Sequence, residues 1–299
     1  MFKRLNSEPE NKQDAPSEIR TGHPNGHFYS PVVDPAELLA RFNNVWPPDA
    51  GGIMGIDFNR QAHETVLDCW FPRHIAKYDY PETRDEHLED GEHFYTCNSQ
   101  FSWLDARTLF VFLNEIRPAR MIEVGSGYSS LLAADVNCRF LSSSCEFHCI
   151  EPFPRDFLVA GLAGISRLSI KKVQDVPLAE FEALNPGDIL FIDSSHVCKT
   201  GSDVNFLYFD VLPRLESGVF IHVHDIFLPL EYPREWVIEE NRSWNEQYLL
   251  RALLMYSDSF KVFFGCNYAF CEFPQKVIRA LALKSGAGFG GGSFWITKV

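Results

Sequence analysis

The stretch Met121-Ile-Glu-Val-Gly-Ser-Gly-Tyr-Ser-Ser130 decides the fold of this chain. Its first four residues form an apolar run broken only by Glu123, which is typical of a buried strand. Two glycines follow, and the residues after them have the apolar spacing of a helix. Glycine at such a junction lets the backbone turn sharply and lets a ligand approach without a Cβ in the way. Together, the strand, the turn and the helix predict the first unit of a nucleotide-binding α/β domain.

Short apolar runs alternate with helical patterns along the chain that follows. The predicted strands lie over residues 121–124, 147–150, 168–173, 189–192 and 219–223. The predicted helices lie over residues 129–134, 155–162, 178–184, 203–212 and 245–256. One further helix, over 103–116, precedes the first strand and stops at Arg117-Pro118. Apolar strands that are each followed by a helix predict a parallel sheet covered on both faces, which is a doubly wound α/β fold.

Two more strands, over 260–264 and 293–297, complete a predicted sheet of seven strands. No second long helical pattern joins them, and the glycine-rich residues 286–292 predict a flexible connection. The core domain therefore spans residues 95–299. Residues 28–94 are irregular and predict an N-terminal cap over the substrate side, and residues 1–27 predict a loose polar leader. The acidic segment 79–93 suits a solvated loop, a lid over the site or a collar for a cationic substrate.

Composition and charge exclude several classes of partner. The formal net charge of −13 argues against nucleic acid, because phosphate binding needs clustered Lys and Arg. Every apolar run is too short to cross a bilayer. Eight cysteines without a CxxC pair, in a chain that starts without an export signal, indicate reduced thiols and a cytoplasmic location. The expected partner is a small-molecule substrate, and a homodimer is compatible with the sequence.

The residues around the glycine turn suggest which cofactor binds there. Glu123 ends the strand, where a carboxylate favours a positive or hydroxyl-bearing ligand over a pyrophosphate. Ser130 stands where a dinucleotide fingerprint has Gly or Ala. Both departures favour S-adenosylmethionine over NAD. The residues of this segment predicted to bind the cofactor are Glu123, Gly125, Ser126, Gly127 and Tyr128.

Acids also end the next two strands. Glu151 follows the second strand, where a carboxylate can accept hydrogen bonds from both ribose hydroxyls of either cofactor. Asp175 follows the third, where it could read an adenine amino group or, equally well, cap a helix before Pro177. Both are predicted to bind the cofactor.

The fourth and fifth strands deliver Asp and His together to the same sheet edge. Asp193, Ser194 and His196 follow the fourth strand, and His222, His224 and Asp225 lie on or just after the fifth. Strand alternation predicts that His222 and His224 share one face and that Asp225 points to the other. Asp193, His196, His224 and Asp225 are the candidate catalytic residues, and Asp193 and Ser194 are also predicted to contact the cofactor. A general base with an orienting acid is favoured over a divalent-metal site, for which Asp193, His224 and Asp225 are the candidates.

Three stretches, over 123–130, 188–196 and 218–227, resemble the class I S-adenosylmethionine-dependent methyltransferases. Further stretches resemble a bacterial subgroup of small-molecule methyltransferases of the "methyltransferase 24" type. The resemblance implies a Rossmann-like sheet whose last strand runs antiparallel. It also implies that the cofactor is bound by Glu123, Gly125, Gly127, Glu151 and Asp193.

The resemblance also implies transfer of a methyl group to an oxygen or nitrogen of a small molecule. In metal-dependent relatives an Asp-Asn pair completes the metal site, whereas Ile226 stands at the Asn position here. A metal would therefore need His224 or His196 as a replacement ligand. The remaining alternatives are a cyclase or lyase that uses S-adenosylmethionine, an NAD-dependent oxidoreductase and a non-catalytic binding module.

Overall fold

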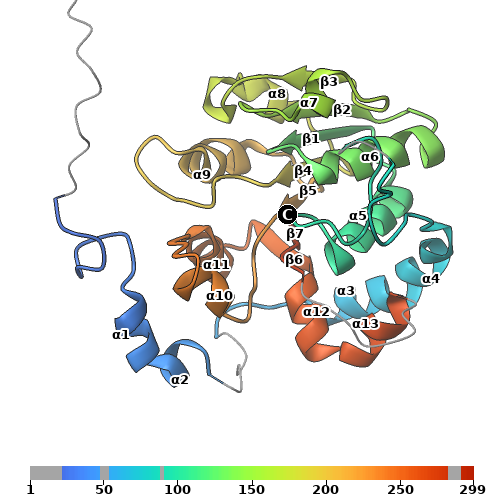
Figure 1. Cartoon of the computed structure of the whole chain (residues 1–299). Coiled ribbons are helices and arrows are strands. Elements are labelled where there is room, and N and C mark those ends of the chain that lie inside the picture. Colours follow the sequence, from blue (N-terminus) through green and yellow to red (C-terminus); the bar gives the residue numbers. More distant parts are fainter. Residues whose placement is uncertain (1–21, 48–53, 88–90, 282–290) are drawn as a thin grey trace, which may run out of the picture.

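A central seven-stranded sheet organises the computed structural model, which describes residues 22–47, 54–87, 91–281 and 291–299 (Figure 1). The strands are β1 Arg120–Val124, β2 Glu146–Ile150, β3 Arg167–Ser169, β4 Ile189–Ile192, β5 Phe220–Val223, β6 Phe260–Gly265 and β7 Phe294–Lys298. Their order is β3-β2-β1-β4-β5-β7-β6, and β7 runs antiparallel to both of its neighbours. The predicted Rossmann-like fold with a reversed last strand is thus confirmed.

Helices cover both faces of the sheet. The longer ones are α5 Trp103–Ile116, α6 Tyr128–Phe140 and α11 Glu246–Tyr256. The shorter ones are α7 Asp156–Val159, α8 Leu178–Glu182, α9 Asp203–Phe206, α10 Arg234–Ile238, α12 Cys266–Glu272 and α13 Pro274–Ala280. α9 continues through a π-helical turn, η4 Leu207–Val211, into a 3-10 turn, η5 Leu212–Arg214. Figure 1 shows α5 and α6 on one side of the sheet and α9 and α11 on the other.

Successive strand residues feed two separate hydrophobic cores. Met121 of β1 packs in the core shared with α5 and α6, and its neighbour Ile122 packs in the core shared with α9 and α11. The same alternation places Trp295 of β7 in the first core and Ile296 in the second. Because both faces are buried, the inner strands are apolar on both sides, as their sequences predict.

Some predicted elements are shorter than their patterns. β3 ends at Ser169, and Ile170 after it is 57% exposed, because the strand lies at the sheet edge with no further partner to bury it. The predicted helix over 155–162 is the single turn α7. β6 and β7 are joined through α12 and α13, each about two turns long, which are too short to give a periodic signal.

The N-terminal region covers the other edge of the sheet. It contains α1 Pro35–Ala40, α2 Phe42–Val45, α3 Arg60–Thr65, the π turn η1 Val66–Trp70, α4 Phe71–His74 and the 3-10 turn η2 Ile75–Lys77. The side-chain amide of Asn59 donates through Nδ2 to the backbone carbonyl of Val262 at 2.9 Å. The backbone amide of Gly265 donates to Nε2 of His63 at 2.8 Å. These side chains satisfy backbone groups that an edge strand such as β6 leaves open.

The domain boundaries stay predictions. Residues 1–21 of the predicted leader, 88–90 of the acidic segment and 286–290 of the glycine-rich connection lie outside the described residues. Within the described ranges, the structure has no helix with the length and apolar character that a membrane crossing needs.

Candidate functional site

The glycine loop joins β1 to α6 and lies against the end of β4. Gly125 has a φ of +80°, and its amide donates to the carbonyl of Ile150 at 3.0 Å. The amide of the next residue, Ser126, donates to Oε2 of Glu151 at 3.2 Å. The loop therefore connects the ends of β1, β2 and β4, which is the switch point where open α/β sheets bind ligands.

Glu123 lies behind this loop and is fully buried. Its carboxylate accepts hydrogen bonds from the hydroxyls of Ser129 and Ser130 and from the thiol of Cys149. Burial outweighs these contacts and raises the pKa of Glu123 to about 7. Two of these partners lie in the first turn of α6, so the carboxylate holds the start of the helix against β1.

Two adjoining hollows lie in front of the loop. They have volumes of about 550 and 150 Å³ and share Gly125, Glu151 and Asp193. Together they are also lined by the other predicted cofactor residues of this edge, which are Ser126, Gly127, Tyr128 and Ser194. Asp175 is exposed and stands outside both linings, whereas Gln174 beside it lines the larger hollow.

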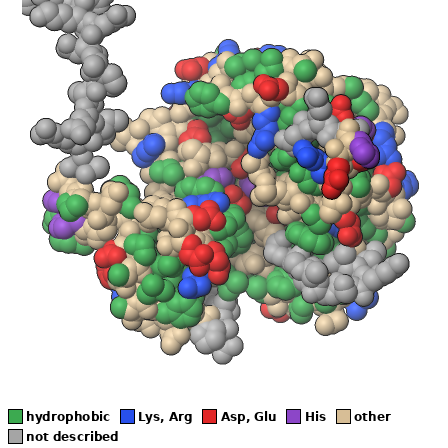
Figure 2. Space-filling model, viewed as in Figure 1, with side chains coloured by type: hydrophobic (Ala, Val, Ile, Leu, Met, Phe, Trp, Pro, Cys, Tyr) green, Lys and Arg blue, Asp and Glu red, His purple; other side chains and the backbone are tan. Residues whose placement is uncertain are grey.

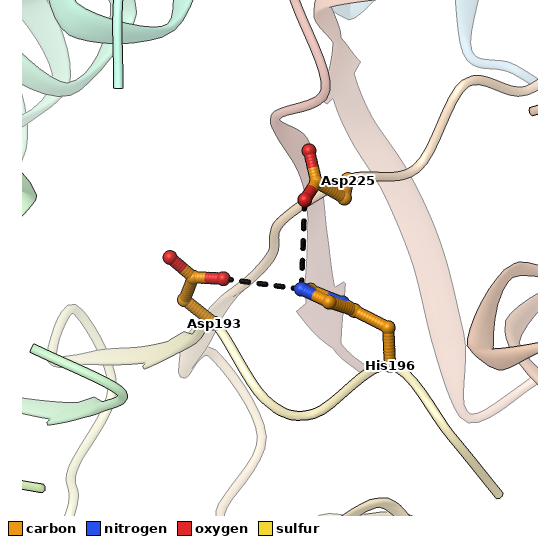
Figure 3. Close-up of side chains that lie close together, drawn as sticks. All are labelled: Asp193, His196 and Asp225. Atoms are coloured by element: carbon orange, nitrogen blue, oxygen red, sulfur yellow. Dashed lines mark ion pairs between the residues drawn. The ribbon is translucent and has the colours of Figure 1, made fainter. Parts of the chain in front are cut away.

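Asp193, His196 and Asp225 converge at the carboxyl edge of β4 and β5 (Figure 3). Nε2 of His196 lies 3.4 Å from Oδ1 of Asp193 and 3.5 Å from Oδ2 of Asp225. His196 is almost fully buried, whereas a third of the Asp193 side chain is exposed. Figure 2 shows histidine and acidic side chains in a recess between the part of the molecule that carries α10 and α11 and the remainder. A ligand in front of the glycine loop would therefore reach this cluster.

Two of these residues have left-handed backbones. The φ angles are 59° at His196 and 56° at Asp225. Such angles are costly for residues with a Cβ and persist where the surrounding structure enforces them, which is frequent at functional sites. The turn at Asp225 also ends the strand alternation, and Oδ1 of Asp225 lies 3.5 Å from Nε2 of His224. The prediction that Asp225 points away from the face of His224 is therefore wrong.

His222 and His224 are buried, as His196 is. Their rings are stacked 5.6 Å apart within an aromatic cluster on the α5 side of the sheet. Nε2 of His222 pairs with the hydroxyl of Ser293 at 2.9 Å. His196, and not His224, completes the group of possible metal ligands with Asp193 and Asp225 in the described part of the chain. Of the two histidines that the sequence offers as ligands, His196 therefore lies with the acids, and His224 of the first candidate set does not complete the group.

The acids and histidines of the cluster shift one another's pKa values. Burial opposes the imidazolium form of His196, but the adjacent carboxylates of Asp193 and Glu246 outweigh burial and raise its pKa to about 10. Burial also acts to raise the pKa of Asp193, yet the neighbouring His224 and His196 outweigh it and lower that pKa. For Asp225 burial prevails over the attraction of His224 and raises the pKa. His196 is therefore held as a cation among acids near neutral pH.

Sequence reasoning missed Glu246 and Asp105. Glu246 begins α11 and accepts a hydrogen bond from Nδ1 of His196 over 3.0 Å. Asp105 of α5 accepts the amides of Gly292 and Ser293 at 2.9 and 2.8 Å, and so fixes the backbone beside Asp225. Each lies in a helix that is distant along the chain from its partners. The one sequence signal for either residue is an acid at a helix position that faces the core.

Comparison with known proteins identifies the central part of the chain. Residues 122–226, from β1 to just past β5, match a family described as a methyltransferase domain. An uncharacterized protein of Archaeoglobus fulgidus is 36% identical over 164 residues, which cover 54% of this chain and 73% of that protein. The segment that matches the family, residues 122–226, contains the glycine loop and all three members of the Asp-His-Asp cluster.

Solved structures give weaker similarity. A protein of Klebsiella pneumoniae described as a candidate O-methyltransferase is 15% identical, covers 88% of this chain and 96% of its own, and has a TM-score of 0.36. A cyclopropane-fatty-acyl-phospholipid synthase-like protein of Lactobacillus casei is 12% identical, with 78% and 99% coverage and a TM-score of 0.33. Likeness at this level says nothing about the substrate of the present chain.

Proposed function

Because the chain belongs to the class I S-adenosylmethionine-dependent methyltransferases, we propose that it methylates an oxygen or nitrogen atom of a small molecule held beside Asp193, His196 and Asp225. The observation that carries this proposal is the convergence of these three side chains at the sheet edge that also bears the glycine loop. Family membership favours methyl transfer over the oxidoreductase, cyclase and binding-module alternatives.

The hollows in front of the glycine loop suit the cofactor. The Glu151 oxygens accept the amides of Ser126 at 3.2 Å and Phe153 at 2.7 Å, which fixes the carboxylate and leaves lone pairs for ribose hydroxyls. Gly127 is open, because a Cβ there would meet nothing closer than Gln100 Oε1 at 3.8 Å. S-adenosylmethionine supplies an activated methyl group on a sulfonium. Most of the acceleration would come from holding the acceptor in line with that methyl, worth about 7–11 kcal/mol in well-oriented systems.

The acidic members of the cluster are the groups best suited to take the proton of the acceptor. His196 retains its own proton near neutral pH, since its pKa is raised to about 10. Asp193 has a lowered pKa and a partly exposed side chain, so it can accept a hydrogen bond from a hydroxyl or amine. In this proposal Asp193 takes the proton as the acceptor gains the methyl group and its proton becomes acidic, and His196 stabilises the charges of the acids around it.

The same three side chains also suit a divalent cation. Nitrogen and oxygen ligands lie about 2.0–2.2 Å from such ions, so two ligands of one ion are about 3–3.5 Å apart. The separations of 3.4 and 3.5 Å in the cluster match this spacing and exceed those of good charge-assisted hydrogen bonds. We therefore propose Asp193, His196 and Asp225 as ligands of a divalent cation, which would take the place of the proton on Nε2 of His196. Such a cation would polarise an acceptor oxygen.

Two contacts support the predicted cap over the substrate side. Residues Gln100 and Phe101 line the smaller hollow beside the glycine loop. Trp46 donates through Nε1 to the carbonyl of Tyr232 at 2.9 Å, near the aromatic residues that surround His196. We propose that residues 28–94, together with Gln100 and Phe101, limit which acceptors reach the cluster.

A binding and turnover experiment tests the proposal. Calorimetry with S-adenosylhomocysteine should show binding, and release of S-adenosylhomocysteine from S-adenosylmethionine should follow addition of one class among hydroxylated acids, phenols, sugars and amines. Transfer of a ¹³C-labelled methyl group then identifies the modified atom by NMR. Absence of binding at millimolar ligand would overturn the cofactor site, and formation of methylthioadenosine would overturn methyl transfer.

A further inference from the structure

The residues just before and at the start of α11 hold His196 in place. The carbonyl of His196 accepts the amide of Asn245 at 3.0 Å and that of Glu246 at 3.2 Å. Its ring centre lies 4.3 Å from that of Trp244, and its Nδ1 lies 3.0 Å from Oε2 of Glu246. Three consecutive residues therefore contact both the backbone and the ring of one histidine, about fifty residues earlier in the chain.

This attachment explains the backbone of His196. A left-handed φ of 59° is unfavourable for a residue with a Cβ. The carbonyl of His196, turned by this conformation, accepts two amides at the start of α11, which otherwise lack helical partners. The strain is thus offset by contacts with Asn245 and Glu246, and the ring has little freedom to turn away.

Glu246 contacts the ring itself. Its side chain has no exposed surface, and its Oε2 accepts hydrogen bonds from Ser194 Oγ at 2.8 Å and from His196 Nδ1. A buried carboxylate loses its hydration at a large cost in free energy, so packing alone would favour an apolar residue at this position. Its contact with His196, at 3.0 Å, is shorter than the contacts of that ring with Asp193 and Asp225.

We propose that Glu246 is a positioning residue, which binds Nδ1 of His196 and thereby keeps Nε2 directed at Asp193 and Asp225. The proposal rests on the proposed function for its significance, since Nε2 contacts the two acids beside which the acceptor is proposed to bind. An imidazole that donates through Nδ1 to a carboxylate presents its other nitrogen in a fixed orientation. The role of Glu246 is therefore the same whether Nε2 carries a proton or contacts a cation.

The Nδ1 proton of His196 gives a direct test by NMR. A buried imidazole proton donated to a carboxylate exchanges slowly with water and resonates far downfield. In ¹⁵N-labelled wild-type protein we expect one such signal that disappears in His196→Asn. In Glu246→Gln, which keeps the side-chain shape and removes the charge, the signal should move upfield or be lost. Persistence of the signal unchanged in Glu246→Gln would overturn the proposal.

Gln247→Met is the matched control. Gln247 is the next residue of α11 and is also buried, but its side chain pairs with the amide of Phe227 and the carbonyl of Leu230. The His196 signal should stay unchanged in this variant. An equal change in both variants would show general loosening of α11 and would also overturn the proposal.

Two features keep the test decisive. If Glu246→Gln proves unfolded by near-ultraviolet circular dichroism, the wild-type spectrum still decides, because a missing downfield signal that depends on His196 contradicts the proposed hydrogen bond. The measurement uses neither cofactor nor acceptor. Failure to detect methyl transfer would therefore count against the proposed function and leave the positioning role of Glu246 intact.

Discussion

Gly125 packs so closely on Asp193 that a Cβ at this glycine would lie 1.8 Å from the Asp193 carbonyl oxygen. The glycine also has a φ of +80°, which is unfavourable for other residues. We expect Gly125→Ala to lower the free energy of unfolding by more than about 2 kcal/mol, because backbone strain of about 1–2 kcal/mol adds to the clash. Urea unfolding followed by fluorescence measures this change.

The second glycine of the loop supplies the control for that prediction. Gly127 has extended backbone, and a Cβ there would be no closer than 3.8 Å to its nearest neighbour. Gly127→Ala should therefore change the free energy of unfolding by less than about 1 kcal/mol. Equal destabilisation by both substitutions would contradict the contact between Gly125 and Asp193 as its cause.

Glu151 and Asp175 are expected to differ in their effect on cofactor binding. Glu151→Gln should weaken S-adenosylhomocysteine binding about 10–100-fold, because hydrogen bonds to a charged group contribute about 1.5–3 kcal/mol. Asp175→Asn should leave the affinity unchanged, since Asp175 is exposed and lies outside the linings of both hollows. Calorimetry on the two variants decides, and a larger loss for Asp175→Asn would show that the ribose contact is wrongly assigned.

The positions of Asp193 and Asp225 could be predicted, because the carboxyl ends of adjacent parallel strands meet at one edge of the sheet. The choice between His196 and His224 could not. It depends on left-handed turns at His196 and Asp225. Asp and His adopt such turns more often than most residues, but still rarely, so the sequence does not locate them. A β-sheet period of two describes side chains only while the strand lasts, and β5 ends at Val223.

The contribution of α11 to the site could not be predicted from the sequence either. The amphipathic pattern over 245–256 predicts the helix correctly, since it shows which face is apolar. It does not show that the first turn docks on the loop after β4, a contact between residues about fifty positions apart. Local patterns thus predict the elements and the sheet edge, whereas contacts between distant loops determine which polar groups meet there.

Removal of one acidic group should distinguish the proposed cation site. Asp225→Asn should reduce Mn²⁺ affinity at least about 10-fold. Even the substitution of a residue that only hydrogen-bonds to a metal ligand typically lowers metal affinity by about 10–100-fold. Asp210→Asn is the control, since this exposed residue of η4 stands apart from the three proposed ligands. Electron paramagnetic resonance of free Mn²⁺ gives the affinity. Failure of the wild-type protein to bind millimolar Mn²⁺ would rule out the site.

His63 should make the protein sensitive to acid. Its ring is fully buried, and Nε2 accepts the amide of Gly265 at the edge of β6, so the neutral ring is favoured. Burial lowers its pKa from 6.5 to about 4.

The stability from the neutral ring is therefore present above pH 6.5 and is lost as the pH falls through 4, by roughly 3 kcal/mol in total. His63→Gln keeps an acceptor without titrating, so its unfolding midpoint in urea should fall less than that of wild type between pH 6.5 and 4. Equal falls in both proteins would place the acid sensitivity elsewhere.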